Sequence, residues 1–292
     1  MATKVLVTGA AGLIGQAFFD FIKSTTPYQV IGIDNFSRFP NTDQRDIINA
    51  DICDWLDTTV NDFDYIYHFA AINGTSSFYK NPTGVIKNNT LIDLSVIEFA
   101  ETNPNCKLIY SSSSEVVAGT SNYPTSEETD IVISNIHNSR WSYRLPKVLA
   151  ENYLMNSNID FAIIRFFNVY GKRSGAGHFV YDIVEKLKSS NFELIGADET
   201  RSFCYVEDAV ESILLIGETV SKDVVNLGSD REIAILDAAN LIATHLRITP
   251  EWQFKDSLRG SVKRRRPDLT KIKQLNPNFN PRSLEEIIPI LF

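Results

Sequence analysis

The sequence predicts an α/β protein built on a doubly wound parallel sheet, with a smaller mixed α/β substrate lobe at its C-terminal side. Two observations lead to this prediction. Through the first half of the chain, short runs rich in β-branched residues alternate with helical patterns, as in a parallel sheet with both faces covered by helices. Three glycines also lie between the first apolar run and the first helical pattern, a spacing typical of a phosphate-binding turn.

The elements of the first half follow from hydrophobic periodicity. Apolar runs at 4–7, 29–33, 65–70, 107–110 and 161–165, with a short strand before Asp51, are expected to be strands joined by right-handed crossovers. Helical patterns cover 13–22, 89–101 and 142–155. In the second of these helices Leu91, Leu94 and Ile97 share one face. In the third, Pro146 is tolerable if the helix starts near residue 142 and keeps the proline in its first turn.

After residue 171 the pattern changes to a mixture of short strands and helices. Strands are expected at 192–195, 224–227 and 251–254, with helices at 179–188, 206–218 and 236–246 and two more from Leu269 and Ser283. We therefore divide the chain into a dinucleotide-binding domain, 1–171, with 203–230 packing back on it, and a substrate lobe formed by 172–202 and 231–292.

Composition and charge exclude several classes of protein. The 292 residues are 43% hydrophobic and 22% charged, with a net charge of −8, which suits a globular chain and argues against a nucleic-acid-binding surface. No apolar run approaches the ~20 residues of a membrane helix, and the first residues read as a strand rather than a signal peptide. The three cysteines and four histidines lack disulfide-framework or metal-site spacing. We expect a reduced cytoplasmic protein with no metal, nucleic-acid partner or membrane partner.

The glycine triplet predicts where a dinucleotide binds. Gly9, Gly12 and Gly15 follow the first expected strand and open the first helix. Glycine at these positions permits a tight turn, a close approach of backbone to a pyrophosphate, and close packing of helix on strand. The free N–H groups of this helix N-terminus, around Leu13 and Ile14, would face the phosphates.

Polar residues after the next two strands bear on the choice of dinucleotide. Asp34 ends the second strand, where a carboxylate can accept both ribose hydroxyls of adenosine and would repel a 2′-phosphate. This favours NAD over NADP, with Arg38 nearby as the counter-indication. Asn35, and Asp51 with Ile52 after the third strand, lie where the adenosine would bind.

Two segments carry groups suited to proton transfer. Four serines followed by Glu115 end one strand, at the sheet edge where ligands of open α/β sheets bind. Tyr143 and Lys147 are one helical turn apart and share a face. A lysine ammonium and a positively charged nicotinamide would lower the pKa of the phenol. Tyr143 could then take a proton from a sugar hydroxyl while hydride leaves the same carbon, with a serine hydroxyl orienting the sugar oxygen.

Taken together, these residues resemble the extended short-chain dehydrogenase/reductase family of nucleotide-sugar enzymes, which use a Rossmann fold. The resemblance covers nearly the whole chain. Its motifs are TGAAGLIG (8–15), HFAA (68–71), the serine run, YRLPK (143–147), RFFNVYG (165–171), RSFCYV (201–206) and RRPD (265–268). There are two departures: VVAG at 116–119 replaces the usual VYG, and Pro146 stands where the family usually has serine.

The resemblance implies a role for each set of residues. Ser113, Tyr143 and Lys147 would form the catalytic triad, and Glu115 would handle a proton at the carbon beyond the ketone. The implied NAD site comprises Gly9, Gly12, Leu13, Ile14, Gly15, Asp34, Asn35, Asp51, Ile52, Phe69, Ala70, Ala71, Asn89, Ser111, Tyr143 and Lys147. The implied contacts with a nucleotide-diphosphate sugar are Ser113, Ser114, Asn168, His178, Arg201 and Arg265, the two arginines gripping the diphosphate.

The resemblance implies an NAD-dependent epimerase or dehydratase that transiently oxidises a sugar hydroxyl to a ketone. A UDP-glucuronate decarboxylase-like enzyme is an alternative, because S/T-x-E is common there, as in Ser113-Ser114-Glu115, and Arg140-Trp141 resembles that branch. Dehydratases with an additional acid would have aspartate at position 114. A third alternative is an NADPH-dependent 4-keto-sugar reductase, against which Asp34 argues. A homodimer is expected through the helices from residues 89 and 142, the family's usual dimer surface.

Overall fold

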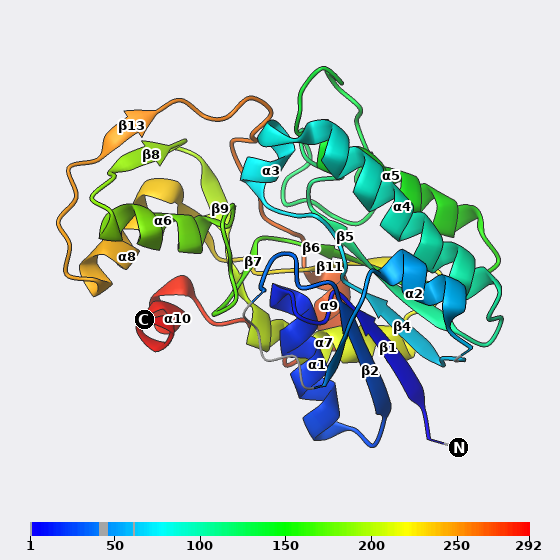
Figure 1. Ribbon diagram of the computed structural model, residues 1–292. Helices are drawn as coiled ribbons and strands as arrows, with labels where there is room; N and C mark the ends of the chain where they lie inside the picture. The colour runs from blue at the N-terminus through cyan, green and yellow to red at the C-terminus, as the bar shows by residue number, and fades with distance from the viewer. Residues whose placement is uncertain (1, 41–45, 61) are drawn as a thin grey trace.

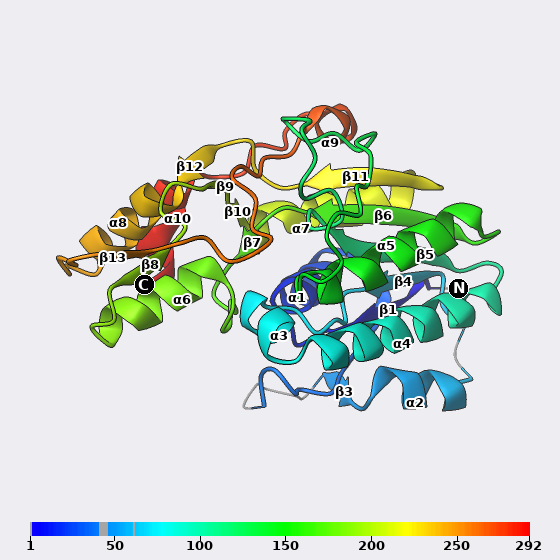
Figure 2. The same ribbon diagram turned by 90° about the horizontal axis from the view of Figure 1, so that it is seen from above.

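The computed structural model describes residues 2–40, 46–60 and 62–292. Its centre is a seven-stranded sheet made of β1 (Lys4–Thr8), β2 (Gln29–Asp34), β3 (Ile47–Asn49), β4 (Tyr65–His68), β5 (Lys107–Ser113), β6 (Asp160–Phe166) and β11 (Asp223–Leu227). The strands are all parallel and follow the order β11-β6-β5-β4-β1-β2-β3; Figure 2 shows β11 at one edge and β3 at the other. The predicted doubly wound parallel sheet is thus confirmed.

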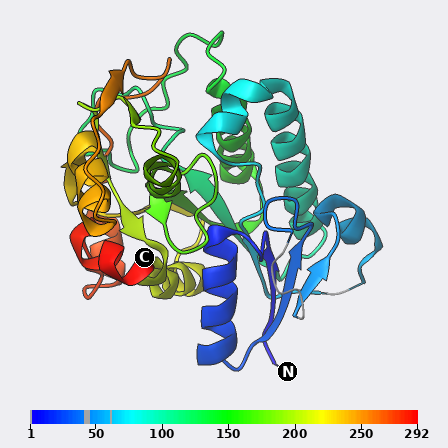
Figure 3. The same cartoon turned by 60° about the vertical axis from the view of Figure 1, so that its left-hand side comes forward.

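Helices cover both faces of this sheet. One layer holds α1 (Leu13–Thr25) and α7 (Val206–Thr219), and the other holds α2 (Ile52–Thr58), α4 (Pro82–Glu101) and α5 (Trp141–Asn156). Figure 3 shows α1 and α4 on opposite sides of the strands. Because side chains alternate along a strand, Val5 and Val7 of β1 pack in the α1 and α7 layer, whereas Leu6 packs in the other.

A smaller lobe lies beside the C-terminal ends of the strands (Figure 1). It contains α6 (Phe179–Lys188), α8 (Ile235–His245), α10 (Leu284–Leu291), the parallel pair β8 (Glu193–Ile195) and β13 (Gln253–Lys255), and the antiparallel pair β9 (Thr200–Ser202) and β12 (Glu232–Ala234). The parallel pair β7 (Val169–Tyr170) and β10 (Cys204–Tyr205) connects this lobe to the sheet. A short helix α9 (Thr270–Leu275) packs on β11 and α7 instead of on the lobe.

The structure departs from the expected helices at three places. The helix α4 begins seven residues before the expected start at residue 89, because the Asn81 side chain caps its first turn by accepting a hydrogen bond from Gly84 N–H, and Pro82 suits the first helical position. Leu91 is 51% exposed, so it does not share the buried face of Ile97. The helix α5 begins at Trp141, which puts Pro146 in its second turn and not in its first.

Two short helices have no counterpart in the expected elements, namely α2 and α3 (Thr75–Lys80). Both follow strands and are six or seven residues long, which is too short for a clear apolar periodicity. None of the helices among the described residues is both long and apolar enough to cross a membrane.

Candidate active site

A cavity of about 470 Å³ lies between the C-terminal ends of the strands and the smaller lobe. A volume of this size suits a small-molecule site. It brings together most residues predicted from the sequence: Gly9, Gly12, Leu13, Ile14, Gly15, Asp34, Asn35, Asp51, Ile52, Phe69, Ala70, Ala71, Ser111, Ser113, Ser114, Glu115, Tyr143, Asn168, His178, Arg201 and Arg265. Lys147 and Asn89 are buried behind the cavity wall.

The glycine turn has the geometry that a pyrophosphate requires. Gly9 has a φ of +67°, and a Cβ there would lie 2.6 Å from the backbone nitrogen of Ala70. A Cβ on Gly15 would lie 2.0 Å from the carbonyl oxygen of Gly9, so helix α1 packs too closely on the turn for any side chain. Gly12 is the N-cap of α1, and no side chain caps the helix there. The first N–H groups of α1 therefore remain available to a phosphate.

Asp34 stands at the end of β2 and orders the turn. Its Oδ2 accepts a hydrogen bond from Ala11 N–H at 3.0 Å, and its Oδ1 accepts one from Phe36 N–H at 2.7 Å. Among the described residues, the hydrogen bonds of Arg38 go to other groups than this carboxylate. Its guanidinium donates to the carbonyl oxygens of Asn73 (3.1 Å) and Ala176 (3.2 Å), inside the cavity. The cation that counted against NAD in the sequence is thus engaged elsewhere, and the residues present fit NAD.

Asn89 fixes the cavity wall from behind. Its side-chain oxygen accepts a hydrogen bond from Ile72 N–H at 2.7 Å, and its amide donates to the Ile72 carbonyl at 3.1 Å. Ile72 itself lines the cavity. Asn89 thus holds the loop after β4 in place and does not line the site.

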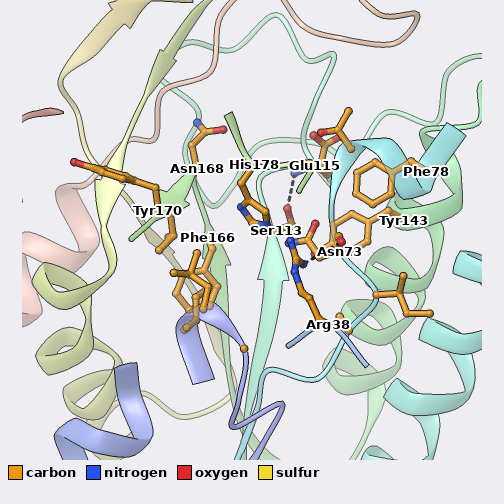
Figure 4. A pocket seen from close by; sticks show the side chains of 18 of the residues that line it. Arg38, Asn73, Phe78, Ser113, Glu115, Tyr143, Phe166, Asn168, Tyr170 and His178 are labelled. Carbon is orange, nitrogen blue, oxygen red and sulfur yellow. Dashed lines mark hydrogen bonds between the residues drawn. The ribbon is translucent and has the colours of Figure 1, made fainter. Parts of the chain in front are cut away.

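Tyr143 and Ser113 lie together in the cavity, from α5 and the end of β5 (Figure 4). The Tyr143 ring stacks on Phe78, with the centroids 4.8 Å apart and an interplanar angle of 16°. The pKa of Tyr143 is raised by burial and by the nearby carboxylates of Asp93 and Glu115, while a hydrogen bond with Ser113 and the charge of Arg38 act in the opposite direction. In the protein without its cofactor the pKa of Tyr143 is therefore raised, whereas the sequence led us to expect a lowered pKa.

Lys147 is fully buried and has a partner that the sequence analysis missed. Its ammonium nitrogen lies 3.3 Å from Asp93 Oδ1, and it sits 4.5 Å from the centroid of the Tyr110 ring. His68 Nε2 lies 3.0 Å from the same Asp93 oxygen, and Tyr110 Oη donates to Asp93 Oδ2 at 2.7 Å. Asp93 is one helical turn after Asn89 on the buried face of α4, and this spacing was the available sequence signal.

Glu115 is held by three arginines. Its carboxylate accepts bidentate hydrogen bonds from Arg140 (2.6 and 2.9 Å) and a single one from Arg144 (2.9 Å), and it forms an ion pair with Arg265 (2.7 Å). Although burial alone would favour the neutral acid, the arginines hold the pKa of Glu115 well below its ordinary value. The lowered pKa favours the ionised carboxylate, which can accept a proton but is a poor proton donor.

The two arginines expected to bind a diphosphate differ in whether their guanidinium N–H groups already have hydrogen-bond partners. Arg201 is occupied by Glu199 (2.5 Å), by Ser261 (3.0 Å) and by two backbone carbonyls. Arg265 is only 8% exposed, and its Nε and Nη2 have no hydrogen-bond partner among the described residues. Buried, unpaired guanidinium donors are costly, so they indicate a place for an anionic ligand.

The two remaining predicted contacts lie at the side of the smaller lobe. Asn168 has a φ of 43°, and its side-chain amide donates to the Ser202 carbonyl at 3.1 Å. Burial and the charge of Arg38 lower the pKa of His178 to about 4, so its imidazole is neutral near pH 7. His178 lines the same cavity as Ser113 and Tyr143 (Figure 4).

The fold, the glycine turn and the serine–tyrosine pair define a dinucleotide-dependent enzyme of the Rossmann class. Comparison with known proteins narrows this class. The model of the NAD dependent epimerase/dehydratase family matches residues 5–228, and the chain belongs to that family. It is therefore an NAD-dependent enzyme.

Individual relatives cover almost the whole chain. The chain is 29% identical to a UDP-N-acetyl-alpha-D-glucosaminuronate decarboxylase of Bacillus cytotoxicus, over 99% of this chain and 97% of the relative. It is 27% identical to UDP-glucuronic acid decarboxylase 1 of Danio rerio, over 93% of this chain and 68% of that protein. Among solved structures, UDP-glucose 4-epimerase of Thermotoga maritima with UDP-glucose superposes with a TM-score of 0.86 at 24% identity, over 99% and 97% of the two chains.

Proposed function

We propose that the enzyme binds a nucleotide-diphosphate sugar in this cavity and transiently oxidises one of its hydroxyls to a ketone. The unpaired Nε and Nη2 of buried Arg265 are the observation that carries the proposal. Three guanidinium groups face the single Glu115 carboxylate, which leaves an excess of positive charge for a diphosphate to neutralise. The names of the relatives, which act on UDP-linked sugars, agree with such a ligand.

Tyr143 is the proposed base. Bound NAD supplies the hydride acceptor, and the phenol is the titratable hydroxyl in the cavity next to Ser113. Ser113 holds the reacting oxygen, and Tyr143 accepts its proton as the carbon loses hydride. The pKa of Tyr143 is raised in the protein without its cofactor. The positive charge of the oxidised cofactor would lower this pKa, so it is part of what activates the phenol.

The protonation state of Glu115 bears on the step after oxidation. Removal of water next to a ketone needs a base to take the proton from the carbon beside the carbonyl and an acid to protonate the leaving hydroxide. An ionised Glu115 tied to three arginines is a poor donor for the second of these. Ser114 also supplies no second carboxyl group. Epimerisation, in which hydride returns to the ketone, needs no such acid.

Decarboxylation of a UDP-linked uronic acid is the second candidate. A carboxylate on the carbon next to a ketone-bearing one leaves as carbon dioxide, and its bonding electrons form an enolate of the ketone. That carbon then takes a proton, and the loss of carbon dioxide itself needs no acid at position 115. Two of the relatives named above are decarboxylases of such sugars, and the Arg140–Glu115 pair couples the two sequence features that pointed to that branch.

A product assay separates these reactions. Purified enzyme with NAD is incubated with UDP-, GDP-, CDP- and dTDP-sugars, including UDP-glucuronate and UDP-N-acetylglucosaminuronate, and products are read by mass and NMR. An isomer of unchanged mass supports epimerisation, and loss of carbon dioxide supports decarboxylation. Loss of water would show dehydration through the same ketone and would overturn only the argument against an acid at position 115. NADPH consumption with a 4-keto sugar, and no reaction with the other sugars, would contradict the proposal. Arg265→Gln should raise KM for the active nucleotide sugar and leave NAD affinity unchanged.

We also propose a homodimer and a cytoplasmic location. Ile86 and Leu91 of α4 and Leu149 and Met155 of α5 are 39–51% exposed, and the two helices pack side by side. A second copy of this surface would cover these apolar side chains. All three cysteines are free thiols, two of them buried, which fits a reducing compartment.

A further inference from the structure

Asp93 is a buried carboxylate that joins three elements beneath the active site. It is 2% exposed and lies on α4, facing Lys147 of α5, His68 at the end of β4 and Tyr110 of β5. A carboxylate this deeply buried is expensive unless it is paired and hydrogen-bonded, and here every partner can donate a hydrogen bond to it.

We propose that Asp93 is a positioning residue for the reaction, whose carboxylate fixes the Lys147 ammonium and places a negative charge near the Tyr143 phenol. The inference rests on the proposed role of Tyr143 as base. Asp93 does not line the cavity. Among the described residues, its hydrogen bonds are with His68, Tyr110 and Lys147, and none joins it to Tyr143. It therefore acts through Lys147 and through its charge.

The protonation states follow from the partners. Burial lowers the pKa of His68, so its ring is neutral, with Nε2–H donating to Asp93 and Nδ1 accepting from the Thr8 hydroxyl at 2.7 Å. Burial opposes ionisation of Asp93, but the Lys147 ammonium and the bond from His68 outweigh it and lower its pKa. The network thus contains one cation and one anion.

This pairing changes what Lys147 can do. From the sequence, the Lys147 ammonium is expected to lower the pKa of Tyr143. In the structure, the Asp93 carboxylate pairs with this ammonium and compensates its positive charge. Burial is the largest influence that raises the pKa of Tyr143. Among the neighbouring groups, Asp93 and Glu115 oppose the phenolate, and Ser113 and Arg38 favour it. Asp93 would keep the phenol protonated until the positively charged cofactor is in place.

Asp93→Asn isolates the charge, because the amide keeps an acceptor for Lys147 and nearly the same shape. We expect the acid limb of the kcat–pH profile to move about one pH unit lower, since removal of one nearby anion favours the phenolate. The phenolate absorbance of the NAD-bound protein, taken as the difference from Tyr143→Phe, should move in the same direction. An acid limb that stays in place or moves to higher pH would overturn the inference.

Two further variants separate positioning from general disruption. Glu151→Gln removes a carboxylate of similar burial (4% exposed) on α5, which binds Ser112 and Arg165 instead, and it should leave the midpoint of the limb unchanged. Asp93→Ala also removes the acceptor for Lys147, and kcat should fall at least tenfold with little change in KM for the sugar. If Tyr143→Phe retains turnover, the proposed function fails; if it is inactive but Asp93→Asn leaves the limb in place, only this inference fails.

Discussion

At the scale of single residues, buried ion pairs set the chemistry of the cavity. Glu115 neutralises part of an arginine cluster, and Asp93 neutralises Lys147. Glu115 is 5% exposed and Asp93 is 2% exposed, so each stays charged only because cations surround it. Burial and the same two carboxylates raise the pKa of Tyr143. Positive and negative charges near the phenol therefore act on its pKa in opposite directions, and the charges of bound ligands can change the net effect.

The Glu115 cluster makes a prediction about stability. Glu115→Gln leaves the guanidinium groups of Arg140, Arg144 and Arg265 without their shared carboxylate, which should lower the free energy of unfolding at pH 7 by about 3–5 kcal/mol. Because the folded pKa of Glu115 is depressed, its stabilisation is fully present above its ordinary pKa of 4.5 and is lost as the pH falls below that value. Urea unfolding at pH 7 and pH 3 measures both effects.

The control for this prediction is Glu98→Gln, at an exposed position of α4, which should change stability by less than about 0.5 kcal/mol. The difference between wild type and Glu115→Gln should shrink from pH 7 to pH 3. A Glu115→Gln protein as stable as wild type at pH 7 would show that the cluster does not depend on this carboxylate.

At the scale of elements, the turn from β1 into α1 depends on glycines without side chains and on a helix start without a side-chain cap. Gly15 leaves no room for a Cβ against the Gly9 carbonyl, and the uncapped start of α1 at Gly12 opens on the cavity. The helix α4 shows the opposite arrangement, with Asn81 as a side-chain cap and Asn89 and Asp93 on its buried face. The N-terminus of α1 is free to bind a ligand, whereas the middle of α4 supports the site from behind.

The glycine turn can be tested by a single methyl group. Gly15→Ala should push α1 away from the turn, costing about 1–3 kcal/mol of stability and lowering NAD affinity at least tenfold, as measured by isothermal titration calorimetry. Gly119→Ala is the matched control: its φ of +97° makes it strained too, but its Cβ meets no atom within 4 Å. It should lose stability while its NAD affinity stays unchanged; equal NAD affinity for Gly15→Ala and wild type would contradict the proposed site.

At the scale of the whole molecule, the smaller lobe lies beside the ends of the sheet strands (Figure 1). Residues of both parts line the cavity. The sheet could be predicted because β-branched runs alternate with helical patterns along the chain and the glycine triplet marks the turn between the first strand and the first helix. The bounds expected for α6, 179–188, were confirmed to the residue. Asp93 could not be found by its charge alone, because its partners His68, Tyr110 and Lys147 come from distant segments. Glu115 was found, but its protonation state depends on arginines that only the fold brings together.

The exposed apolar side chains of α4 and α5 predict an assembly. The wild-type protein should be a dimer by size-exclusion chromatography with light scattering. Leu91→Glu combined with Leu149→Glu should give a folded monomer, because two buried, unpaired charges oppose the interface. The same pair of substitutions to alanine is the milder control. A wild-type protein that remains monomeric at high concentration would contradict the proposed dimer.

The central claim is that Tyr143 takes the proton as the sugar is oxidised, and Tyr143→Phe tests it most directly. The phenylalanine ring keeps the stack on Phe78, so the variant should fold and bind NAD as wild type does. Turnover of the nucleotide sugar identified by the product assay should fall at least a hundredfold. A Tyr143→Phe enzyme that binds NAD and turns over that sugar at the wild-type rate would contradict the account.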